Sequence, residues 1–272
     1  MNLSLRLARN LFLALLTLLI ISCTGKPSSE LLVLKTTGVS QNQLDLTELG
    51  EGTEIRSAGL QLMENPVGLL ELVNGDQSND SVLIVAVHGY QSSGYEWVNG
   101  LKSLGENYGS LFFYRYDWDR CPDVIANELA AEINTIKSSK PYQKVVLFGH
   151  SYGGVVLTYV AAQLTQKNVE VHVIAAPLGG YPNLLDRCES LEYDKEQNIV
   201  YPKWANSIRV IQHRTVHEQD GAFRELETDP QVVDLPFYQV HELPPTMDGH
   251  RLGHNWSVTW VLDHYVGRPH RY

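Results

Sequence analysis

Basic residues and cysteines are both scarce in this chain. Its 272 residues include 21 lysines and arginines against 31 aspartates and glutamates, which gives a formal net charge of −10. A protein this acidic repels nucleic acid and anionic lipid surfaces, so we expect it to bind neither. Three cysteines are too few for a small fold built on disulfides. The 43% of hydrophobic residues excludes disorder, and the length allows one sizeable core.

The first 22 residues have the pattern of a signal peptide. Arg6 and Arg9 give a basic start, and residues 11–21 are almost entirely apolar. This run is too short for a comfortable membrane span. It ends directly before Cys23, in a pattern that resembles a bacterial lipobox, in which the cysteine becomes the lipid-bearing first residue. We therefore expect acyl chains on Cys23 to anchor the protein to a membrane. An ordinary secretory signal cut nearby is the alternative.

The sequence after Cys23 indicates a location and a domain plan. Thr24 stands where an aspartate would favour retention in the inner membrane of enterobacteria, so we expect the outer membrane of a bacterial envelope, facing the periplasm or the exterior. Residues 23–60 are predicted to form a tether and an N-terminal strand region. Residues 61–272 contain no internal repeat and no long linker, which predicts a single domain.

Apolar, β-branched runs alternate with helical patterns from residue 81 onward. Such alternation predicts an α/β fold with a mostly parallel central sheet and helices on both faces. Residues 178–206 lack a clear period, which predicts a small cap-like insertion after the strand at 169–175. The expected strands are 68–73, 82–87, 111–116, 144–148, 169–175, 207–213 and 237–241, and the expected helices are 123–137, 154–164 and 255–264.

The strongest chemical motif is Gly149-His150-Ser151-Tyr152-Gly153. A buried strand leads directly into this G-x-S-x-G sequence and an apolar helix leads directly out, which is the context that a nucleophile elbow requires. Side chains at positions 149 and 153 would clash with the neighbouring strand and helix. The tight turn also predicts a strained backbone at Ser151, whose hydroxyl is then held out at the edge of the sheet as a nucleophile.

In this motif, in His88-Gly89 and in the strand order around them, the chain resembles the α/β-hydrolase family, and within it the bacterial lipases and esterases. The resemblance covers about residues 80–266. It implies a serine hydrolase with an acyl-enzyme intermediate and no cofactor. It also implies two oxyanion donors, the backbone N–H of Tyr152 and that of Tyr90, with Gln91 as the alternative to Tyr90.

The family's chain order of nucleophile, acid and histidine narrows the choice of catalytic base. The base should follow the last core strand and precede the closing helix. His254 fits this position best, and His250, four residues earlier, is the alternative.

The acid should lie shortly after the strand at 207–213. Asp220 in the turn dipeptide Asp220-Gly221 is the preferred candidate. Glu218 and Asp229 are alternatives on the same stretch, and Asp186 is an alternative after the preceding strand. The acid would orient the imidazole and stabilise its cation.

Two further expectations concern the surroundings of the site. Cys121 and Cys188 either form a disulfide or remain reduced thiols. We expect the disulfide, because the two loops emerge at the same edge of the sheet and the envelope permits it. Trp118 ends the strand at 111–116 beside the site, where it either contacts substrate or packs beneath the insertion.

A metal site at His213 and His217 is not expected. Histidines four residues apart share a face only on a helix, and His213 closes a strand.

The sequence therefore predicts an envelope-anchored serine hydrolase that cleaves carboxylic esters, with acyl lipids as the expected substrates. An acyltransferase or a peptidase on the same fold is an alternative. So is a catalytically inactive binding lipoprotein, although all three triad roles can be filled in order.

Overall fold

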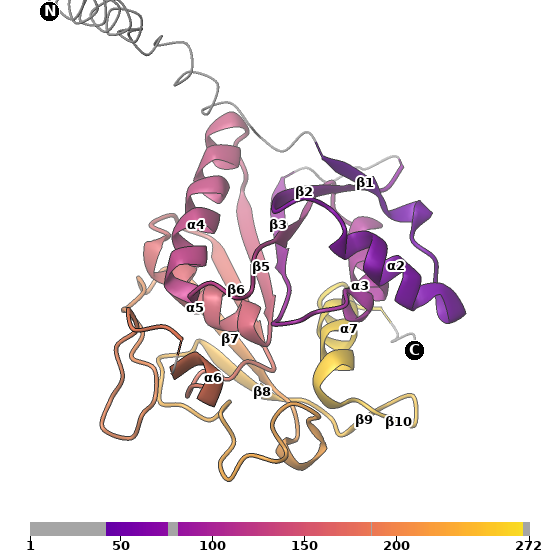
Figure 1. The fold of residues 1–272 in the computed structure, drawn as a ribbon. Helices are drawn as coiled ribbons and strands as arrows, with labels where there is room; N and C mark the ends of the chain where they lie inside the picture. Colours follow the sequence, from indigo (N-terminus) through magenta and orange to yellow (C-terminus); the bar gives the residue numbers. More distant parts are fainter. Residues whose placement is uncertain (1–41, 76–80, 186, 269–272) are drawn as a thin grey trace, which may run out of the picture. The chain divides into compact units, whose positions relative to one another are not determined.

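The computed structural model describes residues 42–75, 81–185 and 187–268 (Figure 1). The expected signal peptide, the expected lipid site Cys23 and the candidate acid Asp186 lie outside the described residues. Within the described ranges, no helix combines the length and the hydrophobicity needed to span a bilayer.

An eight-stranded sheet forms the centre of the described residues (Figure 1). β2 pairs antiparallel with β4, β1 runs parallel to β2, and every other pairing in this sheet is parallel. This confirms the mostly parallel sheet expected from the sequence. In spatial order the strands are β1 (Gln43–Asp45), β2 (Gly68–Val73), β4 (Ser110–Arg115), β3 (Val82–Val87), β5 (Lys144–His150), β6 (Val169–Ile174), β7 (Ile208–Arg214) and β8 (Gln239–Glu242).

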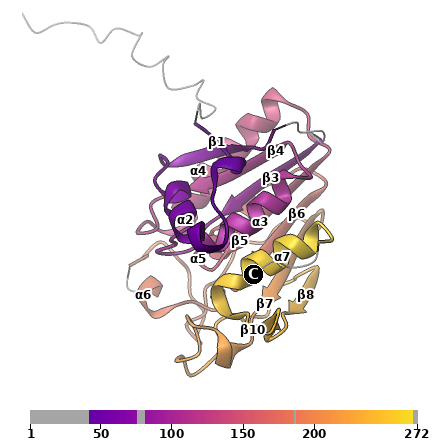
Figure 2. The same ribbon diagram turned by 90° about the vertical axis from the view of Figure 1, so that its right-hand side faces the viewer.

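Helices cover both faces of the sheet, as Figures 1 and 2 show from two directions. One face carries α2 (Ile55–Met63), α3 (Tyr95–Gly105) and α7 (Gly253–Tyr265), and the other carries α4 (Pro122–Ser139) and α5 (Tyr152–Gln163). Each layer buries its own apolar cluster against the sheet. The sheet is therefore buried on both sides, which explains the continuous apolar runs in its central strands.

The two helices on the second face show how local sequence determines packing. α4 begins at Pro122, which suits the first turn of a helix, and buries Ile125, Leu129 and Ile133 at spacings of four residues. α5 is apolar on nearly all sides because it packs against both α4 and the sheet.

The N-terminal part of the domain differs most from the sequence-based expectation. Residues 31–80 carry a weak pattern. The sequence predicted an N-terminal strand region within 23–60 without giving the bounds of β1, and it did not indicate α2. The described residues also include short elements that connect the larger ones. These are the 3-10 turns η3 (Leu46–Glu48), η4 (Gly52–Glu54) and η5 (His217–Gln219), the short helix α6 (Pro182–Leu185) and the hairpin of β9 (Thr246–Met247) and β10 (His250–Arg251).

A disulfide joins Cys121 to Cys188, as expected from the sequence. Cys121 precedes α4, and Cys188 follows α6 within the insertion at 178–206. Buried side chains of the insertion, among them Leu184, Leu191 and Tyr201, belong to the core cluster on the α4 and α5 face. The insertion is thus attached to the domain by a covalent bond and by apolar packing.

The double variant Cys121→Ser/Cys188→Ser should be less stable than the wild type by about 2–4 kcal/mol, because the bridge closes a long loop of the unfolded chain. The two cysteines are 67 positions apart. Urea unfolding under oxidising conditions measures the difference. Wild type treated with reductant is the control and should unfold at the same urea concentration as the variant. Equal stability of variant and oxidised wild type would contradict this account.

Candidate active site

The turn between β5 and α5 holds Ser151 in an unusual backbone conformation. Its φ is +53° and its ψ is −121°, which is strained for a residue with a side chain. The Ser151 N–H donates to the carbonyl of Ile174 at 2.8 Å, which ties the turn to the neighbouring strand β6. The helix begins at the next residue, Tyr152. These are the features of the nucleophile elbow that the sequence motif predicts.

Two glycines make this turn possible. A Cβ atom added at Gly153 would lie 2.3 Å from the carbonyl oxygen of Val87, and one added at Gly149 would lie 2.5 Å from the carbonyl oxygen of Gly153. Backbone atoms cannot move away as a flexible side chain can. Strand β3, the turn and helix α5 therefore come together only because no side chain stands between them.

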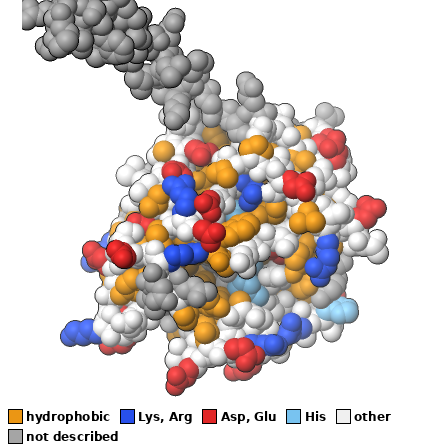
Figure 3. All heavy atoms as spheres, in the orientation of Figure 1, with side chains coloured by type: hydrophobic (Ala, Val, Ile, Leu, Met, Phe, Trp, Pro, Cys, Tyr) orange, Lys and Arg blue, Asp and Glu red, His pale blue; other side chains and the backbone are white. Residues whose placement is uncertain are grey.

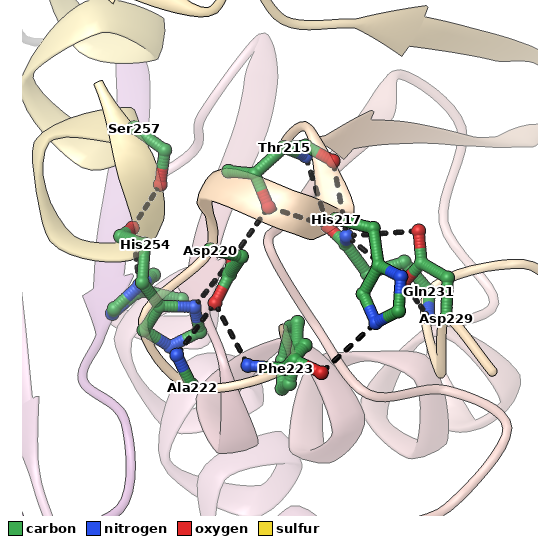
Figure 4. Close-up of polar contacts among 10 residues, drawn as sticks. Thr215, His217, Asp220, Ala222, Phe223, Asp229, Gln231, His254 and Ser257 are labelled. Atoms are coloured by element: carbon green, nitrogen blue, oxygen red, sulfur yellow. Dashed lines mark hydrogen bonds and ion pairs between the residues drawn. The ribbon is translucent and has the colours of Figure 1, made fainter. Parts of the chain in front are cut away.

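His254 and Asp220 form a direct pair, although they lie 34 positions apart (Figure 4). The Nδ1 atom of His254 is 2.9 Å from Oδ2 of Asp220. His254 lies in the first turn of α7, and its ring meets the ring of Phe223 edge-on at a centroid distance of 4.9 Å. The carbonyl of His254 accepts from the hydroxyl of Ser257, which holds the helix turn in place.

Asp220 is fully buried and surrounded by donors (Figure 4). Thr215 donates its hydroxyl to Oδ2, and the backbone N–H groups of Ala222 and Phe223 donate to Oδ1 at 2.8 Å and 3.2 Å. Burial alone would raise the pKa of Asp220, but the hydrogen bonds from His254, Thr215 and Ala222 outweigh it and hold this pKa below its usual value. Asp220 is thus kept as a carboxylate.

The other candidates for base and acid lie elsewhere. His250 is exposed on strand β10, and Glu218 is exposed in η5. Asp229 accepts hydrogen bonds from the backbone and side chain of Gln231. Among the described candidates, the structure brings together only His254 and Asp220.

His88 is buried beneath the loop that follows β3. Its Nε2 faces two donors, the side chain of Arg115 at 3.2 Å and the backbone N–H of Tyr116 at 3.4 Å, so Nε2 is the acceptor. Burial lowers the pKa of His88 to about 3, which keeps the ring neutral. The proton is therefore on Nδ1, which donates to the carbonyl of Gly89 at 2.8 Å. This bond fixes the orientation of the peptide between Gly89 and Tyr90.

Two cavities adjoin Ser151 and His254. One has a volume of about 350 Å³ and is mostly apolar, and the other, of about 340 Å³, is mostly polar. Tyr90 and Gln91 line both of them. Hydrophobic side chains are also visible across the middle of the face shown in Figure 3. The remaining residues of the apolar cavity are Tyr152, Pro177, Tyr181, Leu184, Arg187, Ala222 and Phe223.

Trp118 is not among the described residues that line the two cavities. Its ring meets that of Tyr90 edge-on at 6.5 Å and that of His88 at 6.0 Å, so it packs behind the loop after β3. In the described part of the chain, no cluster of three or more His, Cys, Asp or Glu residues could hold a metal ion.

Sequence reasoning missed several residues of the site. Thr215 supports Asp220, and Arg187 and Tyr181 line the apolar cavity. No local motif marks any of the three. Only the position of Arg187 beside a cysteine expected near the site could have drawn attention to it.

The comparison with protein families covers the chain from within β3 to the end of α7. The family model described as the alpha/beta hydrolase family matches residues 84–267, which is more than half of the chain. The chain belongs to the alpha/beta hydrolase family. No curated protein sequence gives a significant match to it.

Solved structures with some similarity to this chain include two bacterial proteins. Est1E from Butyrivibrio proteoclasticus is 12% identical, with 70% of this chain and 87% of that chain covered and a TM-score of 0.48. XC6422 from Xanthomonas campestris, described as an a/b serine hydrolase without lid, is 17% identical, with 77% and 94% covered and a TM-score of 0.48. Similarity at this level says nothing about the substrate of this alpha/beta hydrolase.

Gly153→Ala should damage the elbow, because its Cβ would overlap the backbone of Val87. We expect a loss of several kcal/mol in the free energy of unfolding, as for other overpacked sites. Gly221→Ala is the matched control, since a Cβ there meets nothing within 4 Å. Thermal unfolding of both variants measures the difference, and equal melting temperatures would contradict the packing argument.

The Asp220 carboxylate should make the stability of the domain depend on pH. Its pKa is lower in the folded protein than in the unfolded chain, so its contribution is present above the unfolded value of about 3.9 and is lost as pH falls through the folded value. The stability difference between wild type and Asp220→Asn should therefore shrink between pH 7 and pH 3. Urea unfolding at both pH values measures it, with Glu218→Gln as the exposed-carboxyl control. A difference that stays constant would contradict the expectation.

Proposed function

We propose that this protein is a serine hydrolase that cleaves carboxylic esters through a Ser151–His254–Asp220 triad. One observation carries the proposal. Ser151 on its strained elbow and His254 paired with a buried carboxylate line the same cavities. A nucleophile, a base and an orienting acid in one place are the requirements of acyl transfer through a covalent intermediate.

The first half of the proposed reaction forms an acyl-enzyme. The Nδ1–H group of His254 donates a hydrogen bond to Asp220, which leaves the Nε2 atom of the neutral ring to act as the base. Nε2 takes the hydroxyl proton of Ser151 while Oγ attacks the carbonyl carbon of the ester. The tetrahedral intermediate then collapses, the C–O bond to the alcohol breaks, and His254 returns the proton to the leaving alkoxide.

The second half releases the acid. His254 takes a proton from water as the water attacks the acyl carbon of Ser151. The bond to Oγ then breaks, and the proton passes to Ser151, which restores the free enzyme. Asp220 remains a carboxylate throughout and stabilises the imidazolium form of His254.

The oxyanion would be held by the backbone N–H groups of Tyr152 and Tyr90. The carbonyl of Gly89 is fixed by His88, and in a trans peptide the following N–H points the opposite way. The N–H of Tyr90 is thereby aimed away from His88. Tyr152 begins α5, so its N–H is one of the free donors at a helix N-terminus. Both residues line the apolar cavity with Ser151.

The apolar walls support an ester with a hydrophobic part. A volume of about 350 Å³ is at the small end of ligand pockets and favours short or medium groups. Tyr181 also lines a second cavity, of about 700 Å³. Acyl lipids, and attachment to the bacterial outer membrane through a lipid on Cys23, remain part of the proposal.

Ser151→Ala should lower kcat for nitrophenyl esters by at least a thousandfold, because it removes the atom that forms the covalent intermediate. Release of nitrophenol measures the rate. Ser138→Ala, on the exposed side of α4, is the matched control and should keep wild-type activity. Activity of Ser151→Ala above about one hundredth of wild type would overturn the assignment.

A further inference from the structure

The apolar cavity contains a charge that simple ester hydrolysis does not require. Arg187, from the insertion at 178–206, lines this cavity together with Ser151 and His254. Among its described lining residues, Arg187 is the only one with a permanent charge. A cation at this place is notable in a chain whose formal net charge is −10.

The guanidinium of Arg187 is held in a defined position. It lies over the ring of Tyr90 at 5.3 Å from the centroid, and its Nη1 is 2.9 Å from Oδ1 of Asp119. Nη2 donates to the carbonyl of Trp118 at 3.4 Å. The next residue, Cys188, is fully buried and disulfide-bonded to Cys121. These contacts place a preorganised cation beside the proposed oxyanion residue Tyr90.

The ion pair with Asp119 does not explain this placement. The side chain of Asp119 is 64% exposed, and ion pairs with exposed partners contribute little to stability. A guanidinium has five N–H donors, and the bonds to Asp119, to Trp118 and to the hydroxyl of Tyr152 occupy only part of that set. The planar arrangement of the donors matches a carboxylate or a phosphate.

We propose that Arg187 determines specificity by binding an anionic group of the substrate, so that the preferred esters carry a carboxylate or phosphate a short distance from the scissile bond. This inference rests on the proposed esterase function and names its substrate class. The apolar walls contact the carbon chain between the two groups, and Arg187 binds the charged end.

The anion could belong to the acyl part or to the alcohol part of the ester, and matched substrates distinguish these sources. Monoethyl succinate carries a carboxylate on the acyl part, and ethyl succinamate is its neutral counterpart. 3-Acetoxypropanoate carries a carboxylate on the alcohol part, and 3-acetoxypropanamide is its neutral counterpart. The readout is the ratio of kcat/KM values within each pair, measured by titration of the released acid.

The wild type should prefer the anionic ester in at least one pair. Arg187→Gln should lower that ratio roughly tenfold to a hundredfold, the range expected for a hydrogen-bonded charge. Arg187→Lys should keep part of the preference, because it retains the charge without the planar donors. Asp119→Asn should raise the ratio of anionic to neutral ester, by up to about fivefold, because it removes a carboxylate that competes with the substrate for Arg187.

Lys167→Gln is the control for net charge, since Lys167 is exposed just before β6, at the opposite edge of the sheet from Ser151. It should leave both ratios unchanged. A wild type that hydrolyses the neutral esters at least as well as the anionic ones overturns this inference and leaves the esterase proposal standing. An equal loss on both members of a pair in Arg187→Gln would show a merely structural role and overturns it too. A wild type that hydrolyses no ester overturns the proposed function and, with it, this inference.

Discussion

The close approach of three backbone segments at the elbow is the constraint on which the site depends. Strand β3, the turn at Ser151 and the start of α5 meet where only glycine fits, and a Cβ at Gly153 would come within 2.3 Å of a backbone oxygen of β3. This contact puts Ser151 directly beside the loop that begins at His88. The nucleophile and the proposed oxyanion donor Tyr90 are therefore brought together by the core of the sheet itself.

The second half of the site comes from distant segments that converge on the same edge of the sheet. Asp220 follows β7, and His254 lies in the first turn of α7. The Nε2 of His150, next to Ser151 in the elbow, contacts the carbonyl of His254 at 3.1 Å, and this bond links α7 to the nucleophile turn. The disulfide adds the insertion as a wall of the apolar cavity. A rigid sheet thus supports loops that carry the chemistry.

The sequence predicted those features that depend on local pattern. The central strands were visible as apolar runs because they are buried on both faces, and the motif at Ser151 was visible because its glycines are required by local geometry. Helix α2 was missed because its pattern is weak and its packing against α3 supports it. Tertiary packing places Thr215 beside Asp220, to which its hydroxyl donates, and it places Arg187 in the wall of the apolar cavity. Neither leaves a period or a motif in the sequence.

The central claim is that Ser151 is a nucleophile activated by His254. The most direct measurement is the mass of the intact protein after reaction with a fluorophosphonate probe, followed by mapping of the modified peptide. The account predicts one adduct per chain, located on Ser151 and formed much more slowly in a His254→Ala variant. An unmodified protein, or an adduct on another residue, would contradict it.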